Sequence, residues 1–266
     1  MRDFIIIGGD KRQVYLKNIL TDKGFRVCHI MYTDDISELG NTGNYSDVIL
    51  PIPLSKDSVN LYSINGLDIE LESLYGKIKP YQRVYGCNIR EDISEHIFDF
   101  MKDKTFKLIN AYLTAQGTLR LMLENTESYI IGKKVLIIGF GDVASTLSDM
   151  LSKLGLRVTI AMRNQYKGLT AKTSGYDVIN FEDITKSIDD FDYIIGTVPY
   201  TILTHEQISR MNNKSIYIEL ASAPFTANKS SFEKYSKTYI YGGALPGRYL
   251  PLSSAELMAD FILNSH

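Results

Sequence analysis

Alternating apolar and polar segments at the start of the chain predict a βαβ unit followed by further strands. Between the first two apolar runs, apolar residues recur at the spacing of a helix, and this pattern ends at Gly24. The polar interval 55–80 has no clear pattern. We expect one small α/β domain over residues 1–112, with strands in the apolar runs 3–7, 25–31, 48–50 and 83–87.

The second half of the chain alternates more regularly. Two helix starts have the spacing of a capping box, Thr204 with Gln207 and Ser253 with Glu256. Alternation of strands and helices predicts a parallel, doubly wound sheet. The expected strands are 134–138, 157–162, 178–180, 192–197, 215–220 and 238–242, and the expected helices are 142–154, 183–188, 205–211 and 254–264.

Strong helix formers over 114–127 predict a long helix that leads into this second sheet. The sequence therefore predicts an α/β protein with two Rossmann-like domains, each with a parallel sheet, joined by a long connector helix and with a cleft between them. The first domain is expected over 1–112. The second, over 113–266, is expected to include the connector and the C-terminal helix.

Composition excludes several classes of protein. The 266 residues are 44% hydrophobic and 23% charged, which is typical of a globular protein. The 29 basic and 31 acidic residues nearly cancel, so a nucleic-acid partner is not expected. Cys28 and Cys87 form no CxxC pair and the histidines form no HxxxH pair, so neither a disulfide framework nor a metal site is expected. Because the chain has no signal peptide and no apolar stretch of about 18 residues, we expect a cytoplasmic protein without a membrane partner.

A glycine motif follows the expected strand 134–138. In such a motif the first glycine permits a tight turn, the second lets the backbone approach a pyrophosphate, and the small third residue keeps the helix near the sheet. The following helix directs free amide groups at the anion. We predict a dinucleotide site here, the alternative being a simple strand-to-helix turn. The motif residues are Gly139, Phe140, Gly141, Asp142, Val143 and Ala144.

The residues after the next strand predict which dinucleotide binds. An NAD site places a carboxylate there, about 20 residues after the motif, to bind the ribose hydroxyls. This chain has Arg163 and Asn164 instead. An arginine favours a 2′-phosphate, so we expect NADP to be preferred over NAD, which is the alternative cofactor. The alternative is that Arg163 is a solvated surface charge.

Two later strand ends are expected to flank the nicotinamide. One strand ends in Thr197-Val198-Pro199 and the next is followed by Ser222. Ligands of open α/β sheets bind outside the carboxyl ends of the strands. Either segment could instead be only a turn.

The first domain has a second candidate site at the start of its first helix. Gly8-Gly9 is followed there by Asp10, Arg12 and Gln13. A glycine pair and cations at a helix N-terminus predict a carboxylate or other anion site. Because the spacing differs from the dinucleotide motif, we expect substrate here, the alternative being an exposed turn.

An ordered set of motifs spans almost the whole chain. The motifs are Gly8-Gly9-Asp10, Arg12-Gln13, Asn110-Ala111, Thr114 through Gly117, Val135–Gly141, Thr197-Val198-Pro199, Glu219-Leu220-Ala221-Ser222 and Ala244-Leu245-Pro246-Gly247. This set resembles the dipicolinate synthase family, in particular its A subunit. The resemblance implies an enzyme of sporulation, in the mother cell, that makes pyridine-2,6-dicarboxylate from a dihydro- or hydroxytetrahydro-dipicolinate precursor. It also implies NADP as hydride acceptor and, for a partner, a flavoprotein-like B subunit. The chain departs from the family at 223–226, where a lysine is expected, so no lysine acts there.

Oxidation of such a dicarboxylate needs a base and cations beside the cofactor. Asp10 is the candidate base, and Arg12 and Arg248 are the candidate cations. Asn110 and Thr114 are expected either to bind a substrate carboxylate or only to cap the connector helix.

The sequence is also compatible with other functions. The rival hypotheses are a reductase of another keto acid or imine, an NADP-sensing protein without turnover, and a chain that only supports its B subunit. A homo-oligomer is expected.

Overall fold

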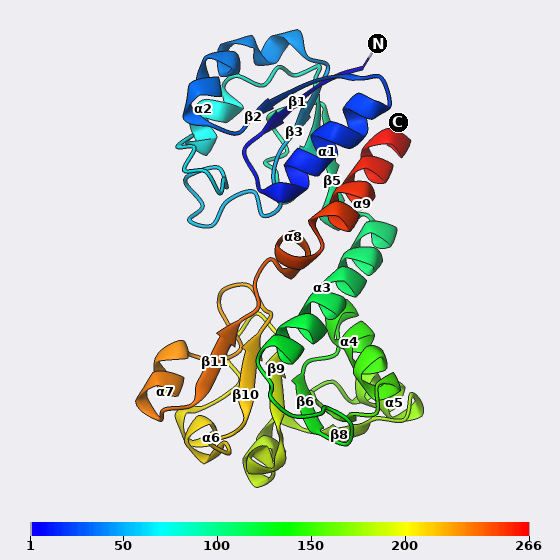
Figure 1. Ribbon diagram of the computed structural model, residues 1–266, viewed down its shortest axis with the longest axis vertical. Coiled ribbons are helices and arrows are strands. Elements are labelled where there is room, and N and C mark those ends of the chain that lie inside the picture. The colour runs from blue at the N-terminus through cyan, green and yellow to red at the C-terminus, as the bar shows by residue number, and fades with distance from the viewer. Residues whose placement is uncertain (1, 266) are drawn as a thin grey trace. The chain divides into compact units, whose positions relative to one another are not determined.

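The structure is a computed structural model that describes residues 2–265 (Figure 1). The chain divides into two compact units. Unit 1 contains the residues up to Leu113 and those from Pro246 onward, and unit 2 contains Thr114–Leu245. The first break lies one residue from the expected boundary. Assignment of the C-terminal helix to the second domain was wrong, because this helix packs within unit 1.

Unit 1 is built on a five-stranded parallel sheet with strand order β2-β1-β3-β4-β5. Alternate side chains of β1 enter two different apolar clusters, Ile5 and Ile7 on one face and Phe4 and Ile6 on the other. Burial of both faces is why β1, an interior strand of this sheet, is a nearly continuous apolar run. The strands are β1 (Asp3–Ile7), β2 (Arg26–Ile30), β3 (Asp47–Ile49), β4 (Arg83–Gly86) and β5 (His96–Asp99); the last was not predicted.

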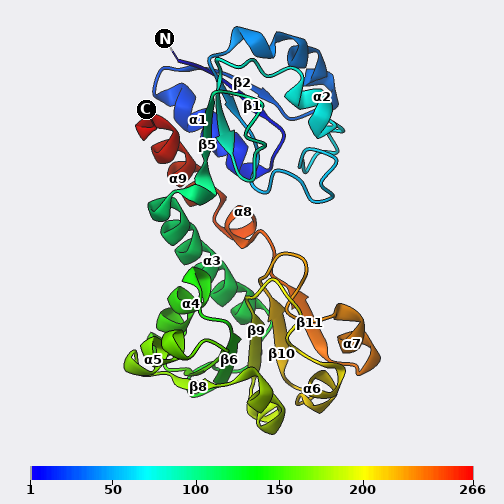
Figure 2. The same cartoon turned by 180° about the vertical axis from the view of Figure 1, so that it is seen from behind.

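The C-terminal helix α9 (Pro251–Asn264) lies beside α1 (Lys11–Asp22) (Figure 2). Leu16 and Leu20 of α1 share a buried cluster with Met258 and Ile262 of α9. The apolar stripes of the two helices therefore bury each other. The other helical segments are η1 (Thr33–Asn44), α2 (Leu71–Tyr75), η2 (Phe100–Lys102) and α8 (Leu245–Tyr249).

The connector helix α3 (Lys104–Glu124) begins ten residues earlier than predicted. Its start is marked by Asp103, whose Oδ1 accepts a hydrogen bond of 2.6 Å from the backbone N of Phe106. Acceptance of a free first-turn amide by a carboxylate is the usual N-cap interaction. The capping signal was thus present in the sequence, upstream of the helix formers on which the prediction was based.

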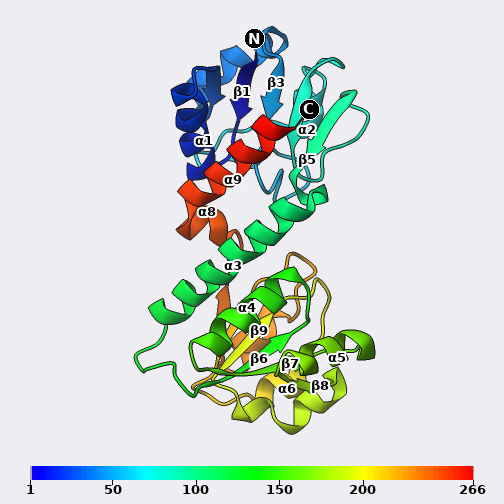
Figure 3. The ribbon, with the colours of Figure 1, turned by 90° about the vertical axis from the view of Figure 1, so that its right-hand side faces the viewer.

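Unit 2 contains a six-stranded parallel sheet with strand order β11-β10-β9-β6-β7-β8, as expected for a doubly wound fold. From β6 the chain adds β7 and β8 on one side, and then β9, β10 and β11 on the other side of β6. Helix α4 covers one face of the sheet beside β6 (Figure 3). The strands are β6 (Lys134–Ile138), β7 (Arg157–Ala161), β8 (Asp177–Ile179), β9 (Tyr193–Gly196), β10 (Ile216–Glu219) and β11 (Thr238–Tyr241). The fold class predicted from the alternation, α/β with two parallel sheets, is confirmed.

Two helices of unit 2, α4 and α6, match the prediction within one residue, two short 3-10 helices replace the predicted helix 183–188, and two further helices are additions. The segments are α4 (Asp142–Lys153), α5 (Gln165–Thr173), η3 (Phe181–Lys186), η4 (Ile188–Asp190), α6 (His205–Arg210) and α7 (Lys229–Lys234), of which α5 and α7 were not predicted. Both missed helices are rich in polar residues and lack a clear apolar period.

One of the two predicted capping boxes is present. The backbone N of Gln207 donates to Thr204 Oγ1 at 3.2 Å, and the backbone N of Thr204 donates to Gln207 Oε1 at 3.0 Å. The box predicted at Ser253 was wrong, because α9 starts at Pro251, three residues earlier than predicted. Proline favours this position since it lacks the amide that would otherwise be unpaired. Over residues 2–265, no helix has both the length and the apolar character needed to cross a bilayer.

Candidate dinucleotide and substrate sites

The glycine turn between β6 and α4 has the backbone geometry that the motif predicts. Gly139 adopts a φ of +105°, and a Cβ there would lie 2.6 Å from Thr197 Oγ1 and 2.7 Å from Val198 Cγ1. Only glycine fits both the conformation and the space. Gly141 is the N-cap of α4, and a Cβ there would meet no atom within 4 Å. The turn is closed at its first glycine and open at its second, where a ligand would approach.

The rest of the motif builds the helix start. Ala144 is buried, while Asp142 is exposed. Val143 and Phe140 are half-buried, and the Phe140 ring packs edge-on to that of Tyr176. The α4 N-terminus has no side-chain cap. Its first amides are therefore available to an anion.

The loop after β9 is fixed to the neighbouring strand. Thr197 Oγ1 donates to the carbonyl of Ile138 at 2.7 Å, one residue before the glycine turn. Pro199 is exposed, and Val198 is held by Thr226, whose hydroxyl accepts from the Val198 N at 3.2 Å and donates to the Val198 O at 2.8 Å. The predicted segment 197–199 thus lies beside the glycine turn rather than in a separate loop.

A buried carboxylate, Glu219, stands at the carboxyl end of β10. Its oxygens accept hydrogen bonds from Tyr217 Oη at 2.7 Å and from the backbone N of Ala221 and Ala227 at 3.1 and 3.2 Å. Burial raises the pKa of Glu219, although these donors oppose the rise. Burial and the nearby carboxylate also raise the pKa of Tyr217. The candidate Ser222 follows this position and is exposed.

Sequence reasoning gave no role to Glu219, Tyr217 or Thr226. The available signal was an acidic residue at the end of the apolar run Ile216-Tyr217-Ile218. Charged residues are rarely buried without partners.

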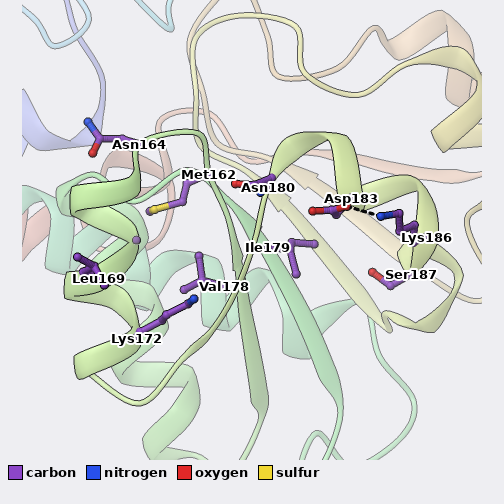
Figure 4. A pocket seen from close by; sticks show the side chains of 11 residues that line it. Met162, Asn164, Leu169, Lys172, Val178, Ile179, Asn180, Asp183, Lys186 and Ser187 are labelled. Atoms are coloured by element: carbon purple, nitrogen blue, oxygen red, sulfur yellow. Dashed lines mark hydrogen bonds and ion pairs between the residues drawn. The ribbon is translucent and has the colours of Figure 1, made fainter.

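Arg163 and Asn164 lie just beyond the end of β7, and both are exposed. No carboxylate directly follows this strand. Asn164 also lines a cavity of about 590 Å³ between α5 and η3, where Asp183 and Lys186 form an ion pair of 2.6 Å (Figure 4). The other lining residues are Met162, Gly168, Leu169, Lys172, Val178, Ile179, Asn180 and Ser187.

In unit 1, Asp10, Arg12 and Gln13 come together at the N-terminus of α1. Asp10 is the N-cap, and Gln13 completes a reciprocal capping box by accepting from the Asp10 N at 2.8 Å. Arg12 Nε and Nη2 donate to the two Asp10 oxygens at 2.9 and 2.7 Å, and Nη2 also contacts the Ile52 carbonyl. Both charges are buried. The alternative of an exposed turn with solvated charges was therefore wrong.

Gly247 of α8 closes this cluster. A Cβ at Gly247 would lie 2.7 Å from Arg12 Nε and 2.8 Å from Asp10 Oδ2. Tyr62 is a further neighbour, since its raised pKa owes part of the rise, after burial, to Asp10. Arg248, by contrast, is exposed, and its guanidinium lies 4.7 Å from the centre of the Tyr249 ring.

Asn110 and Thr114 lie six and ten residues past the first residue of α3, and both are half-buried. The capping role was wrong, because α3 begins at Lys104 and its first turn is capped by Asp103. Asn110 belongs to unit 1 and Thr114 to unit 2. Among residues 2–265 no group of three or more His, Cys, Asp or Glu side chains is placed to hold a metal ion.

A doubly wound sheet with an open glycine turn at its central strand defines a Rossmann-type, dinucleotide-binding protein. Comparison with known families agrees. Residues 110–238 match the NAD-binding domain of S-adenosyl-L-homocysteine hydrolase. Residues 3–111 match the N-terminal domain of the dipicolinate synthase A subunit.

Relatives of the whole chain are consistent with these two matches. The dipicolinate synthase A subunit of Bacillus subtilis (strain 168) is 23% identical over 278 residues, which cover 97% of this chain and 93% of the relative. The crystal structure of the corresponding protein from Bacillus halodurans has a TM-score of 0.84 at 20% identity and covers 98% of this chain and 96% of that one. The predicted resemblance to the A subunit of dipicolinate synthase is confirmed.

A transhydrogenase from Sinorhizobium meliloti has a similar fold. Its crystal structure has a TM-score of 0.65 at 12% identity, covering 98% of this chain and 92% of the other. Together these comparisons support a nicotinamide-dependent oxidoreductase.

Proposed function

We propose that this protein oxidises a dihydro-dipicolinate precursor, or a hydroxytetrahydro-dipicolinate precursor that also loses water, to dipicolinate, with transfer of hydride to NADP and release of a proton, during sporulation. The observation that carries the proposal is the open glycine turn of a Rossmann domain in a chain that resembles the A subunit of dipicolinate synthase from end to end. The ring becomes aromatic in this reaction, so oxidation is the thermodynamically favoured direction. The protein's task is therefore mainly to bind and orient two molecules.

The proposed cofactor site uses the residues around the glycine turn. Free amides of α4 would bind the pyrophosphate above Gly141. Arg163, exposed and with no carboxylate beside it at the end of β7, would favour the 2′-phosphate of NADP over NAD. Thr197 to Pro199 and Ser222 would flank the nicotinamide.

All residues of the proposed substrate set except Thr114 belong to unit 1. Arg248 is the exposed cation of this unit's candidate set, so it is proposed to bind a substrate carboxylate directly. Arg12 is already engaged by Asp10, and this pair would act together, with Gln13, beneath Gly247. A buried carboxylate that accepts two hydrogen bonds from an arginine is a poor proton acceptor. Asp10 would therefore accept a proton only if substrate displaces Arg12. Asn110 and Thr114 stay proposed carboxylate ligands. A cytoplasmic location, self-association and a flavoprotein-like partner protein are also proposed.

The reaction is tested by absorbance at 340 nm with purified protein, NADP and freshly generated precursor, with and without the flavoprotein-like partner. We expect growth of the NADPH signal together with a pyridine dicarboxylate product. NADP binding without turnover in both conditions would contradict the proposal. That result would favour a nucleotide sensor or a different keto acid or imine substrate.

The cofactor site is tested by Gly141→Ala. Because the added Cβ meets no atom within 4 Å and the φ of Gly141 is −93°, the fold should be unaffected. The methyl group would stand where the pyrophosphate approaches the backbone, so we expect NADPH affinity to fall by about tenfold or more. Calorimetric titration and a thermal melt measure the two effects separately. Wild-type affinity in this variant would contradict the site.

A further inference from the structure

The segment 221–227, which follows β10, is held at both ends by one side chain. Glu219 Oε1 accepts from the Ala221 N at 3.1 Å, and Oε2 accepts from the Ala227 N at 3.2 Å. The carboxylate is fully buried and also accepts from Tyr217 Oη. Because an unpaired buried amide is costly, loss of either oxygen would release one end of the loop.

Thr226, inside this segment, ties it to the loop after β9. Its hydroxyl makes both hydrogen bonds to Val198, and its carbonyl accepts from the Ile202 N at 2.8 Å. Gly196 leaves the necessary room. A Cβ there would overlap Tyr217 Oη and lie 2.7 Å from Thr226 Cβ.

The two loops tied in this way occupy one half of the cofactor-binding sheet. In a doubly wound sheet each half holds one nucleotide, and ligands lie outside the carboxyl ends of the strands. The glycine turn and Arg163 follow β6 and β7, on the proposed adenosine side. Glu219, at the end of β10, holds the Ala227 N, and the adjacent Thr226 binds Val198 after β9, so the two strand ends are connected on the proposed nicotinamide side.

We propose that Glu219, acting through Thr226, is a positioning residue that fixes the loops after β9 and β10 against the nicotinamide end of the cofactor. The inference depends on the proposed function, since it takes the ligand to be a nicotinamide dinucleotide. We assign Glu219 a positioning role rather than a catalytic one, because its carboxylate is fully buried and both oxygens are bonded to its own loop or to Tyr217.

The test compares two nucleotides in the full-length protein carrying Glu219→Gln. The amide has one acceptor oxygen in place of two, so it keeps the shape but cannot accept from both Ala221 and Ala227. Calorimetry measures affinity for NADPH and for 2′-phospho-ADP-ribose, which has the adenosine end without the nicotinamide. We expect NADPH affinity to fall about tenfold, since the backbone N–H of either Ala221 or Ala227 loses its acceptor. Affinity for 2′-phospho-ADP-ribose should stay unchanged.

A second pair of variants keeps the test valid if Glu219→Gln folds poorly. Thr226→Val removes the hydroxyl at nearly constant volume, and Thr226→Ser keeps the hydroxyl. We expect Val to reproduce the selective loss of NADPH affinity and Ser to restore it. Asp47→Asn is the matched control: it alters a fully buried carboxylate of unit 1, bound to Arg2, and should change neither affinity.

The inference is overturned if the Glu219 and Thr226→Val variants bind NADPH as the wild type does, or lose both nucleotides equally. The proposed function fails in a different way, which is visible in the wild-type protein: it would bind neither nucleotide, or it would bind NADP without turning over the precursor.

Discussion

Single side chains, placed at the ends of strands, are proposed to distinguish the two candidate nucleotides. After β7 the chain offers Arg163 and Asn164 where an NAD site would offer a carboxylate. The side chain of Arg163 is exposed, so its replacement leaves the buried core unchanged. A functional effect of Arg163 can therefore be measured with little interference from stability.

We predict that Arg163→Asp lowers the ratio of NADP to NAD affinity by about tenfold or more, because a cation beside the 2′-phosphate becomes an anion. Calorimetric titration with each nucleotide measures the ratio. Arg157→Asp is the control, since this exposed arginine lies at the other end of the same strand. An unchanged ratio in Arg163→Asp would make the arginine a surface charge only.

Glu219 gives a prediction about pH. Burial raises its pKa in the folded protein above the ordinary 4.5, so ionisation favours the unfolded chain. The contribution of Glu219 to stability is therefore present below its ordinary pKa and is lost as the pH rises through the raised value. Urea unfolding of the wild type and Glu219→Gln at several pH values measures it. The stability of the wild type relative to the variant should fall with rising pH; a constant difference would contradict the shift.

At the scale of elements, α8 can pack against the start of α1 because Gly247 has no side chain. Gly247 has no positive φ, so its backbone would accept alanine. The obstacle is the Asp10–Arg12 pair, whose atoms lie within 3 Å of the added Cβ. The candidate substrate cluster and the packing of the two helices are thus one arrangement.

Gly247→Ala is expected to destabilise the protein by about 1–3 kcal/mol through overpacking against a buried ion pair. Chemical denaturation measures this effect. Gly76→Ala is a suitable control in the same unit, because its Cβ would make only ordinary contacts of 3.7 Å. Equal stability of the two variants would mean that the ion pair moves aside without cost.

At the scale of the whole molecule, the chain leaves unit 1, forms unit 2 and returns. The returning helix α9 covers Leu16 and Leu20 of α1. Unit 1 is therefore discontinuous in sequence, whereas unit 2 is continuous and has its own core.

We predict that residues 114–245, expressed alone, fold cooperatively and bind NADPH without turning over substrate. Residues 1–113 alone should remain partly unfolded, because an apolar face of α1 would be exposed to water. Circular dichroism melts and calorimetry test both fragments. A cooperative melt of fragment 1–113 would show that α9 is dispensable for unit 1.

The sequence by itself determined the local features of this protein. Apolar runs at the right spacing identified most strands, Thr204 and Gln207 identified a helix start, and Gly139 with Gly141 identified the turn. Each of these depends on neighbours along the chain. Periodicity, capping and the φ of a glycine are properties of short segments.

Only the tertiary structure decided which distant residues meet. The return of α9 to unit 1, the pairing of Arg12 with Asp10 beneath Gly247, and the burial of Glu219 beside Thr226 all depend on which surfaces pack together. A charged residue in a sequence carries no mark of its burial or its partner. The physical reason is that desolvation and pairing energies arise from the assembled surroundings, which a segment does not contain.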